Sequence, residues 1–187
     1  MFDTLLNYLE SSTVISLGVL IVLSIYFILT FWIFIYKYIE LSSNISVEKE
    51  ELNSIVARDA MINPLSKIGH CIGKTPISKE FLNVCEISLI REASTGISWL
   101  SIISSTAPFI GLFGTVIGIL ESFAKFSTVS KVSFSVIAPA ISEALVATAA
   151  GIFVAIFAYT FHQITIRKIY EFNTYIKSQI DIILARN

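Results

Sequence analysis

Glu143 and Thr148 lie in the longest apolar stretch of the chain, within the segment SEALVATAAG from Ser142 to Gly151. A carboxylate can bind and release a proton, and a hydroxyl can both donate and accept a hydrogen bond. Ionisable groups at bilayer depth are costly, so they face protein or water and often mark ion paths. Thr115 is a second hydroxyl of this kind, in the preceding apolar stretch. The sequence therefore predicts a proton path or polar pore lining that includes Thr115, Thr148 and Glu143.

The depth of Glu143 depends on which end of its helix projects from the membrane. Counting about 20 residues back from Arg167, the length that spans a bilayer, reaches Ala147. Glu143 would then lie at the outer interface, already hydrated. An ion-path residue and an interface residue therefore both remain possible, whereas Thr148 lies near the middle of the stretch at almost any placement.

Composition indicates an integral membrane protein. Of 187 residues, 55% are hydrophobic and 14% charged, and the net charge of −1 leaves no basic footprint for nucleic acid. Charges are absent from Ser11 to Tyr36 and from Ala93 to Leu120, and Glu143 is the only one from Val132 to Ile166. Since about 20 apolar residues cross a bilayer as a helix, we expect an all-α protein with three transmembrane helices and long cytoplasmic helical extensions. The third helix is long enough to project from the bilayer.

Lysine and arginine indicate the orientation. None precedes the first apolar stretch, seven fall from Lys37 to Arg91, and four follow Ile166. The positive-inside rule places the N-terminus outside and the long loop and the tail in the cytoplasm. The expected segments are an outer N-terminus (1–13), a first transmembrane helix (14–38), a cytoplasmic helical loop (39–95), a second transmembrane helix (96–123), a short outer loop (124–134), a third transmembrane helix (135–165) and a cytoplasmic amphipathic C-terminal helix (166–187).

The cytoplasmic loop is expected to form helical extensions and a small bundle. Ser42–Asn44 predicts a polar break after the first transmembrane helix. An acidic first turn after Ser46 begins a helix that Asn63-Pro64 ends, and a short helix follows to Ile72. Gly73–Pro76 predicts a turn.

A further cytoplasmic helix should begin after Ser78 as its N-cap. It meets no breaker before Gly96, so it could continue directly into the second transmembrane helix. In the tail, apolar residues at steps of three and four predict one buried helical face that packs on the loop of the same chain or on a neighbouring subunit. These residues are Ile169, Phe172, Ile176, Ile180 and Ile183.

Small residues form a stripe on each of the last two transmembrane helices. Such stripes let helix backbones approach closely in lipid. The first consists of Ala107, Gly111, Gly114, Gly118 and Ser122, and the second of Ala140, Ala144, Thr148, Gly151, Ala155 and Ala158. We expect Gly111, Gly114, Gly118, Ala144 and Gly151 to serve helix packing or a subunit interface, although small stripes are also common in plain helix packing.

Two prolines are expected to shape these helices. Pro108 removes one backbone hydrogen bond and should kink its helix or widen one turn. Ser104, Ser105 and Thr106 are close enough to compensate with their hydroxyl groups. Pro139 lies near the outer start of the third helix and shapes its first turns.

Enzyme chemistry is not indicated. No Ser-His-Asp set, carboxylate pair or glycine-rich nucleotide loop is visible, so we expect no catalytic residues and no cofactor. Cys71, Cys85 and His70 do not have the spacing of a zinc site, which needs four ligands. The cysteines are expected to be thiols on the reducing side that behave as small buried apolar residues.

Two segments carry a resemblance to a known family. STAPFIGLFGTVIGILESF (Ser105–Phe123) and IAPAISEALVATAAGIFVAI (Ile137–Ile156) closely resemble the signature segments of the ExbB/TolQ family, relatives of the flagellar stator protein MotA. The resemblance extends to the three-helix topology, the orientation and the cytoplasmic loop. GLFGTV and EALxATAxG are its most specific parts.

The resemblance implies a function. It implies a pentameric ring in the bacterial inner membrane, with a periplasmic N-terminus, around a dimer of single-pass ExbD- or TolR-type partners. Protons would pass at the boundary between ring and partner, where an aspartate of the partner titrates, and motion would be delivered to a TonB- or TolA-type protein. Thr115, Glu143 and Thr148 match family residues that face the pore or the subunit interface.

The chain departs from the family pattern at several positions. Ala140 stands in place of a glycine, Ser142 of an alanine, and Phe157 of a proline, so we expect a straighter third helix near its inner end. The cytoplasmic loop is also small. The pattern does not divide ExbB from TolQ.

Alternative functions are a passive oligomeric scaffold that positions a partner without ion flow, a MotA-type stator and an unaccompanied channel. MotA needs a fourth transmembrane helix. A channel without a partner is disfavoured because Glu143 is expected to be the only acid at membrane depth.

Overall fold

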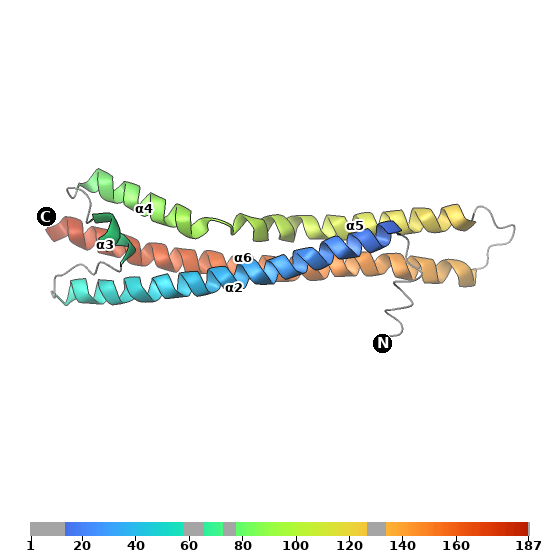
Figure 1. Ribbon diagram of the computed structural model, residues 1–187, viewed down its shortest axis with the longest axis horizontal. Helices are drawn as coiled ribbons and strands as arrows, with labels where there is room; N and C mark the ends of the chain where they lie inside the picture. The colour runs from blue at the N-terminus through green and yellow to red at the C-terminus, as the bar shows by residue number, and fades with distance from the viewer. Residues whose placement is uncertain (1–13, 58–65, 73–77, 127–133, 187) are drawn as a thin grey trace. The chain divides into compact units, whose positions relative to one another are not determined.

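The computed structural model describes residues 14–57, 66–72, 78–126 and 134–186. Every regular element in these ranges is a helix (Figure 1). The predictions for the N-terminus, for the helix end at Asn63-Pro64, for the turn at 73–76 and for the outer loop 127–133 lie outside the described residues. The helices are α2 (Val14–Val56), α3 (Lys67–Ile72), α4 (Lys79–Ser94), α5 (Ser98–Phe126) and α6 (Phe134–Arg186).

Three of these helices, α2, α5 and α6, are long and apolar enough to cross a membrane by length and composition. Each also carries large apolar side chains on its surface, such as Trp32 on α2, Phe109 on α5 and Ile156 on α6, which are 69%, 71% and 58% exposed. A water-soluble chain would have to bury such groups. The structure is therefore that of an all-α membrane protein.

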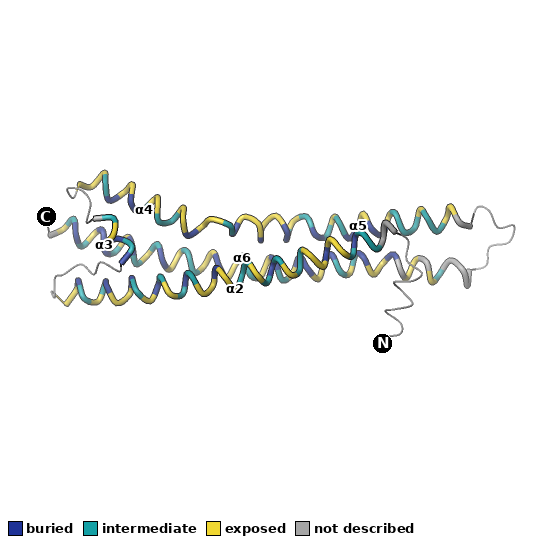
Figure 2. Tube along the Cα trace, in the orientation of Figure 1, coloured by how far each residue is buried: buried dark blue, intermediate teal, exposed yellow. Residues whose placement is uncertain are grey.

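The chain divides into two compact units, each with its own core. The first comprises the described residues up to Trp32 together with Trp99–Phe161. The second comprises Ile33–Ser98 and the chain from His162 onward. Buried and exposed positions alternate along the helices of both units, as expected when only one face of a helix contacts its neighbours (Figure 2).

Small and branched residues fill the core of the first unit. An aromatic cluster lies beside it, in which Phe157 of α6 packs against Phe27 and Phe31 of α2, with ring centroids 5.9 and 5.7 Å apart. Helix α6 continues without interruption through Phe157. A ring that packs between two helices thus stands where the ExbB/TolQ pattern has a proline. The buried core residues are Val19, Leu23, Ile103, Ala107, Ala147, Val154, Ala155 and Ala158.

The second unit is held together by the C-terminal part of α6. Its apolar face packs against residues of α2, α3 and α4, among them Leu41, Ile68 and Leu82. This confirms the predicted buried face of the tail and its packing on the loop of the same chain. The members from α6 are Phe172, Ile176, Ile180 and Ile183, with Ile169 partly buried beside them.

The predicted break at Ser42–Asn44 is wrong, because α2 runs as one helix from Val14 to Val56. Serine and asparagine lower helix propensity by only about 0.5 kcal/mol each. Leu41 and Ile45, on either side of the polar residues, are 1% and 6% exposed and belong to the core of the second unit. Tertiary packing therefore outweighs the weak local preference.

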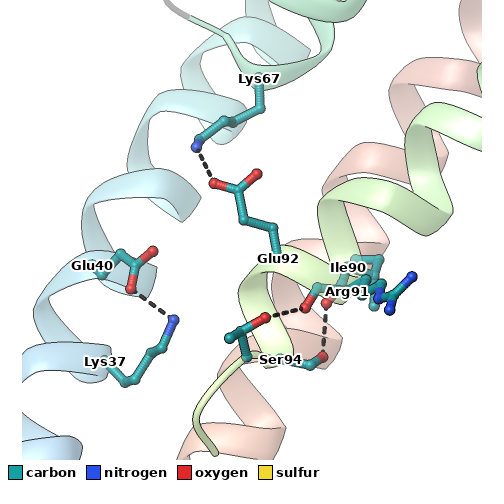
Figure 3. Close-up of polar contacts among 8 residues, drawn as sticks. Lys37, Glu40, Lys67, Ile90, Arg91, Glu92 and Ser94 are labelled. Carbon is teal, nitrogen blue, oxygen red and sulfur yellow. Dashed lines mark hydrogen bonds and ion pairs between the residues drawn. The ribbon is translucent and has the colours of Figure 1, made fainter.

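Helix α4 begins as predicted, with the Ser78 hydroxyl accepting a hydrogen bond from the Phe81 amide at 3.2 Å. It does not continue into α5, because the chain turns at Gly96 with φ of +85°. Only glycine adopts this conformation without steric cost. Hydroxyl groups of Ser94 and Thr95 close the end of α4 by donating to the carbonyls of Ile90 and Arg91 (Figure 3).

A buried carboxylate connects three segments of the second unit. Glu48 of α2 is fully buried. Its side chain accepts hydrogen bonds from the Ser66 hydroxyl at 3.0 Å, the Lys67 amide at 2.7 Å and Nε2 of Gln179 at 3.0 Å. Nε2 of Gln179 also lies 2.8 Å from the Glu48 carbonyl. The start of α3 and the last turns of α6 are thus both joined to α2.

We expect Glu48→Ala to destabilise the second unit by about 1–3 kcal/mol, since buried donors would lose their acceptor. Thermal unfolding of the detergent-solubilised protein measures the effect. Glu50→Ala is the matched control, because Glu50 is exposed on the same helix. Equal melting temperatures for the two variants would show that the network contributes nothing.

Candidate functional site

Thr115 of α5 and Thr148 of α6 are in direct contact in the first unit. Their hydroxyl oxygens lie 2.5 Å apart. Oγ1 of Thr115 is 2.9 Å from the carbonyl oxygen of Ala144, and Oγ1 of Thr148 is 3.3 Å from that of Gly111. Thr115 is 8% exposed and Thr148 half-buried. Two hydroxyls thus form a continuous polar contact between two apolar helices.

The hydrogen count allows two arrangements of this contact. Each hydroxyl carries one hydrogen and can also accept. In one arrangement Thr148 donates to Thr115, which donates to the carbonyl of Ala144. In the other, Thr115 donates to Thr148, which donates to the carbonyl of Gly111. Rotation of two C–O bonds interconverts them, so the pair can reverse its polarity without moving either helix.

Glycines at the contact between α5 and α6 allow the two helix backbones to approach each other closely. A β-carbon at Gly111 would lie 2.6 Å from the carbonyl oxygen of Ala147, and one at Gly151 would lie 2.6 Å from that of Ala107. Real β-carbons do not approach oxygen so closely. The backbones of α5 and α6 are therefore in direct contact beside the threonine pair, and only hydrogen fits at these two positions.

The other predicted packing residues occupy different surroundings. Ala144 is buried and supplies the carbonyl that faces Thr115. A β-carbon at Gly114 would lie 2.9 Å from side-chain atoms of both Ala147 and Val19, so α2 also packs here. Gly118 is half-buried and its carbonyl accepts from Ser122. A role of any of these residues between subunits stays a prediction.

Ala147 is a contact residue that the predicted stripe did not include. It is 2% exposed and faces both Gly111 and Gly114. Ala147 is three residues after Ala144 and four before Gly151, and positions at these spacings share a helix face. This spacing indicates that Ala147 belongs to the same packing face.

The prolines lie within continuous helices. Pro108 is inside α5 and Pro139, which is exposed, inside α6. The hydroxyls of Ser104, Ser105 and Thr106 donate to carbonyls of Ser101 and Ile102. These bonds therefore do not go to the carbonyl of Ser104, the one that Pro108 deprives of its amide donor.

Two acidic residues, Glu143 and Glu121, lie in the apolar helices α6 and α5. Glu143 lies in α6, but its side chain is outside what the structure describes, so its predicted role stays a prediction. Glu121 is a second acid, close to the end of the apolar span Ser98–Ala124 of α5, so the expectation of a single acid at membrane depth stays a prediction. Its Oε2 is buried and has no hydrogen-bond partner among the described residues. Glu121 follows Gly114 by seven residues, on the same helix face, and this spacing was the missed signal.

Metal-ligating side chains do not gather in the described part of the chain. No group of three histidine, cysteine or acidic residues there is close enough to hold a metal ion. Cys71 and Cys85 are joined as a disulfide, which corrects the prediction of two separate thiols. The site is therefore a hydroxyl pair between closely packed apolar helices, in an all-helical membrane protein.

Comparison with known proteins agrees with this class. Residues 60–178 match the model of the MotA/TolQ/ExbB proton channel family. The chain is 40% identical to an ExbB-like biopolymer transport protein of Helicobacter pylori over the full length of both chains. The chain therefore belongs to the MotA/TolQ/ExbB proton channel family.

More distant relatives match over shorter regions. The biopolymer transport protein ExbB of Pseudomonas putida is 38% identical over 100 residues, which is 52% of this chain and 30% of the relative. The Tol-Pal system protein TolQ of Pseudomonas aeruginosa is 48% identical over 66 residues, or 35% of this chain and 29% of the relative. Similarity to both branches leaves the division between ExbB and TolQ open.

Proposed function

We propose that this chain is a proton-channel subunit of the bacterial inner membrane. It would form a homo-oligomeric ring, a pentamer by resemblance, with an ExbD- or TolR-type subunit in the central pore. Proton flow would drive mechanical work on a TonB- or TolA-type partner. The observation that carries the proposal is the contact of Thr115 with Thr148 in a member of this family.

The hydroxyl pair suits such a role because it is polar without being charged. A hydroxyl holds water or a neighbouring acid by hydrogen bonds and avoids the cost of burying an ion. Threonine does not titrate near neutral pH, so a carboxylate must supply the group that carries the proton. We assign that group to an aspartate of the single-pass partner, with Glu143 as a relay or interface residue. Glu121 is a further acid on the same helix as Thr115.

Because its hydroxyl groups can rotate, the pair could form hydrogen bonds with a neighbouring acid as that acid gains or loses a proton. In either arrangement the hydroxyl oxygens can accept a hydrogen bond from a carboxylic acid, and to donate to a carboxylate one hydroxyl would have to turn its hydrogen out of the pair. Rotation about a C–O bond would thus adapt the pair to either protonation state, with no helix movement. Hydrogen bonds from a neutral group to the acid would lower the cost of exchanging its proton in an apolar surrounding.

Co-purification with the native neighbour tests the class of function. We expect a stable complex with a single-pass membrane protein that carries one aspartate in its transmembrane segment. A stable partner without a membrane carboxylate would instead identify a passive scaffold and contradict the proposal.

Glu143→Ala should abolish energised activity, since it removes either a relay or an interface contact. Glu143→Gln separates these two roles, because the amide keeps hydrogen bonding but cannot titrate. Complex assembly is measured on native gels of membrane preparations of each variant. Activity is measured in cells that express the same variants. Intact assembly together with wild-type activity in Glu143→Ala would eliminate the residue from the mechanism.

A further inference from the structure

Cys71 and Cys85 are the two cysteines of the chain, and they face each other in the second unit. Cys71 is near the end of α3, and Cys85 is in the middle of α4. Their Cα atoms are 6.4 Å apart, within the range of about 4.4–6.8 Å that a disulfide can join. The structure pairs them as a disulfide. Neither residue belongs to the hydroxyl site.

Noncovalent contacts hold α3 in place independently of this bond. Its Lys67 amide donates to the buried Glu48, and the Lys67 ammonium lies 3.1 Å from Glu92 of α4 (Figure 3). Ile68 is 1% exposed in the core of this unit. The two sulfur atoms would therefore remain opposite each other after reduction, and the site is prearranged to close again.

We infer that Cys71 and Cys85 form a reversible redox site, reduced in unstressed cells and oxidised to a disulfide by peroxide. The inference rests on the proposed function, with residues 39–95 in the cytoplasm as the positive-inside rule predicts. The cytoplasm keeps thiols reduced, and disulfides that form there are usually transient or redox-sensing. A purely structural disulfide would not persist in that compartment.

The two cysteines have different exposures, which sets the order of reaction. Cys71 is half-buried and Cys85 is 4% exposed. Peroxide reacts first at Cys71: the O–O bond breaks, and a sulfenic acid and one water form. The Cys85 thiol then attacks that sulfur, the S–S bond forms and a second water leaves. Two electrons have passed from the two thiols to one peroxide molecule. Two glutathione thiols reverse the change and become glutathione disulfide.

Oxidation ties α3 covalently to α4, across a sequence separation of 14 residues. A cross-link of this loop length restricts the unfolded chain and stabilises the folded state. We expect the oxidised protein to unfold several degrees above the reduced protein, with the same helix content.

Thiol trapping in cells tests the inference without any assay of proton flow. Cells are acid-quenched before and after a pulse of hydrogen peroxide, and free thiols of the full-length protein are labelled with a polyethylene-glycol maleimide. We expect two labels per chain before the pulse, none directly after it, and two again after recovery. The band should remain that of a single chain on a non-reducing gel.

Single-cysteine variants test the order of attack. In Cys85→Ser, peroxide should leave Cys71 as a sulfenic acid that dimedone captures. In Cys71→Ser, Cys85 should react at least about tenfold more slowly, given its burial. Reaction of Cys85 as fast as Cys71 would overturn the assigned order.

Three results would overturn the redox site itself. These are two labels per chain after the pulse, no label in unstressed cells, or a disulfide that forms only between two chains. None of these outcomes bears on the hydroxyl pair, so the proposed proton function stands or fails on its own experiments.

Discussion

Thr148→Val should remove at least about 90% of energised activity while the protein still folds and inserts. Valine has nearly the shape of threonine, so packing between α5 and α6 is retained. Thr115 keeps a partner, because its hydroxyl lies 2.9 Å from the carbonyl of Ala144 and can still donate to it. Only the second hydroxyl of the pair is lost. A tenfold loss of rate corresponds to about 1.4 kcal/mol.

Thr148→Ser is the matched variant, because it restores the hydroxyl and removes one methyl group. We expect its activity to lie near that of the wild type. Activity is measured in cells as partner-dependent uptake or envelope integrity, with membrane levels of each variant determined by immunoblot. Equal activity of the valine and serine variants would contradict a role for the hydroxyl.

Gly151→Ala should separate α5 from α6 and lower both stability and activity. The added β-carbon would lie 2.6 Å from the carbonyl oxygen of Ala107 and 3.0 Å from Cα of Gly111. Neither is the end of a flexible side chain, so a backbone must move. Overpacking of this kind typically costs about 1–3 kcal/mol. Because Gly111 is also next to Thr148, the movement should lengthen the hydroxyl contact as well.

Gly18→Ala supplies the control on a helix of the same unit. A β-carbon at Gly18 would meet nothing within 4 Å. Alanine favours a helix over glycine by up to about 1 kcal/mol, so this variant should melt at or above the wild-type temperature. Thermal unfolding in detergent compares the two variants. A Gly151→Ala protein as stable as Gly18→Ala would show that close contact of α5 and α6 is unimportant.

The sequence predicts much of this architecture because membrane helices leave a strong signal. Long uncharged stretches correctly indicate three apolar helices, and steps of three and four residues in the tail correctly indicate its buried face. Ser78 is recognisable as a helix cap because the hydroxyl acts on an amide three residues away. All of these features depend on local periodicity or local hydrogen bonds.

Other features depend on contacts between distant segments. The polar residues after Leu41 predict an end to the first helix. Only the packing of Leu41 and Ile45 in the core of the second unit shows why α2 continues. Glu48 looks like one of several surface acids, yet Gln179, 131 residues away, lies against it. The disulfide requires the relative positions of α3 and α4, which spacing alone does not supply. Residue type and position in the apolar stretches single out Thr115 and Thr148, whereas their direct contact depends on how α5 and α6 pack.

Proton flux through the purified complex tests the central claim most directly. The chain is reconstituted with its single-pass partner in lipid vesicles that contain a pH-sensitive dye, and a potential is imposed across the membrane. We expect flux with the wild type and with Thr148→Ser, and at most about a tenth of it with Thr148→Val. Wild-type flux through the Thr148→Val complex would contradict the account.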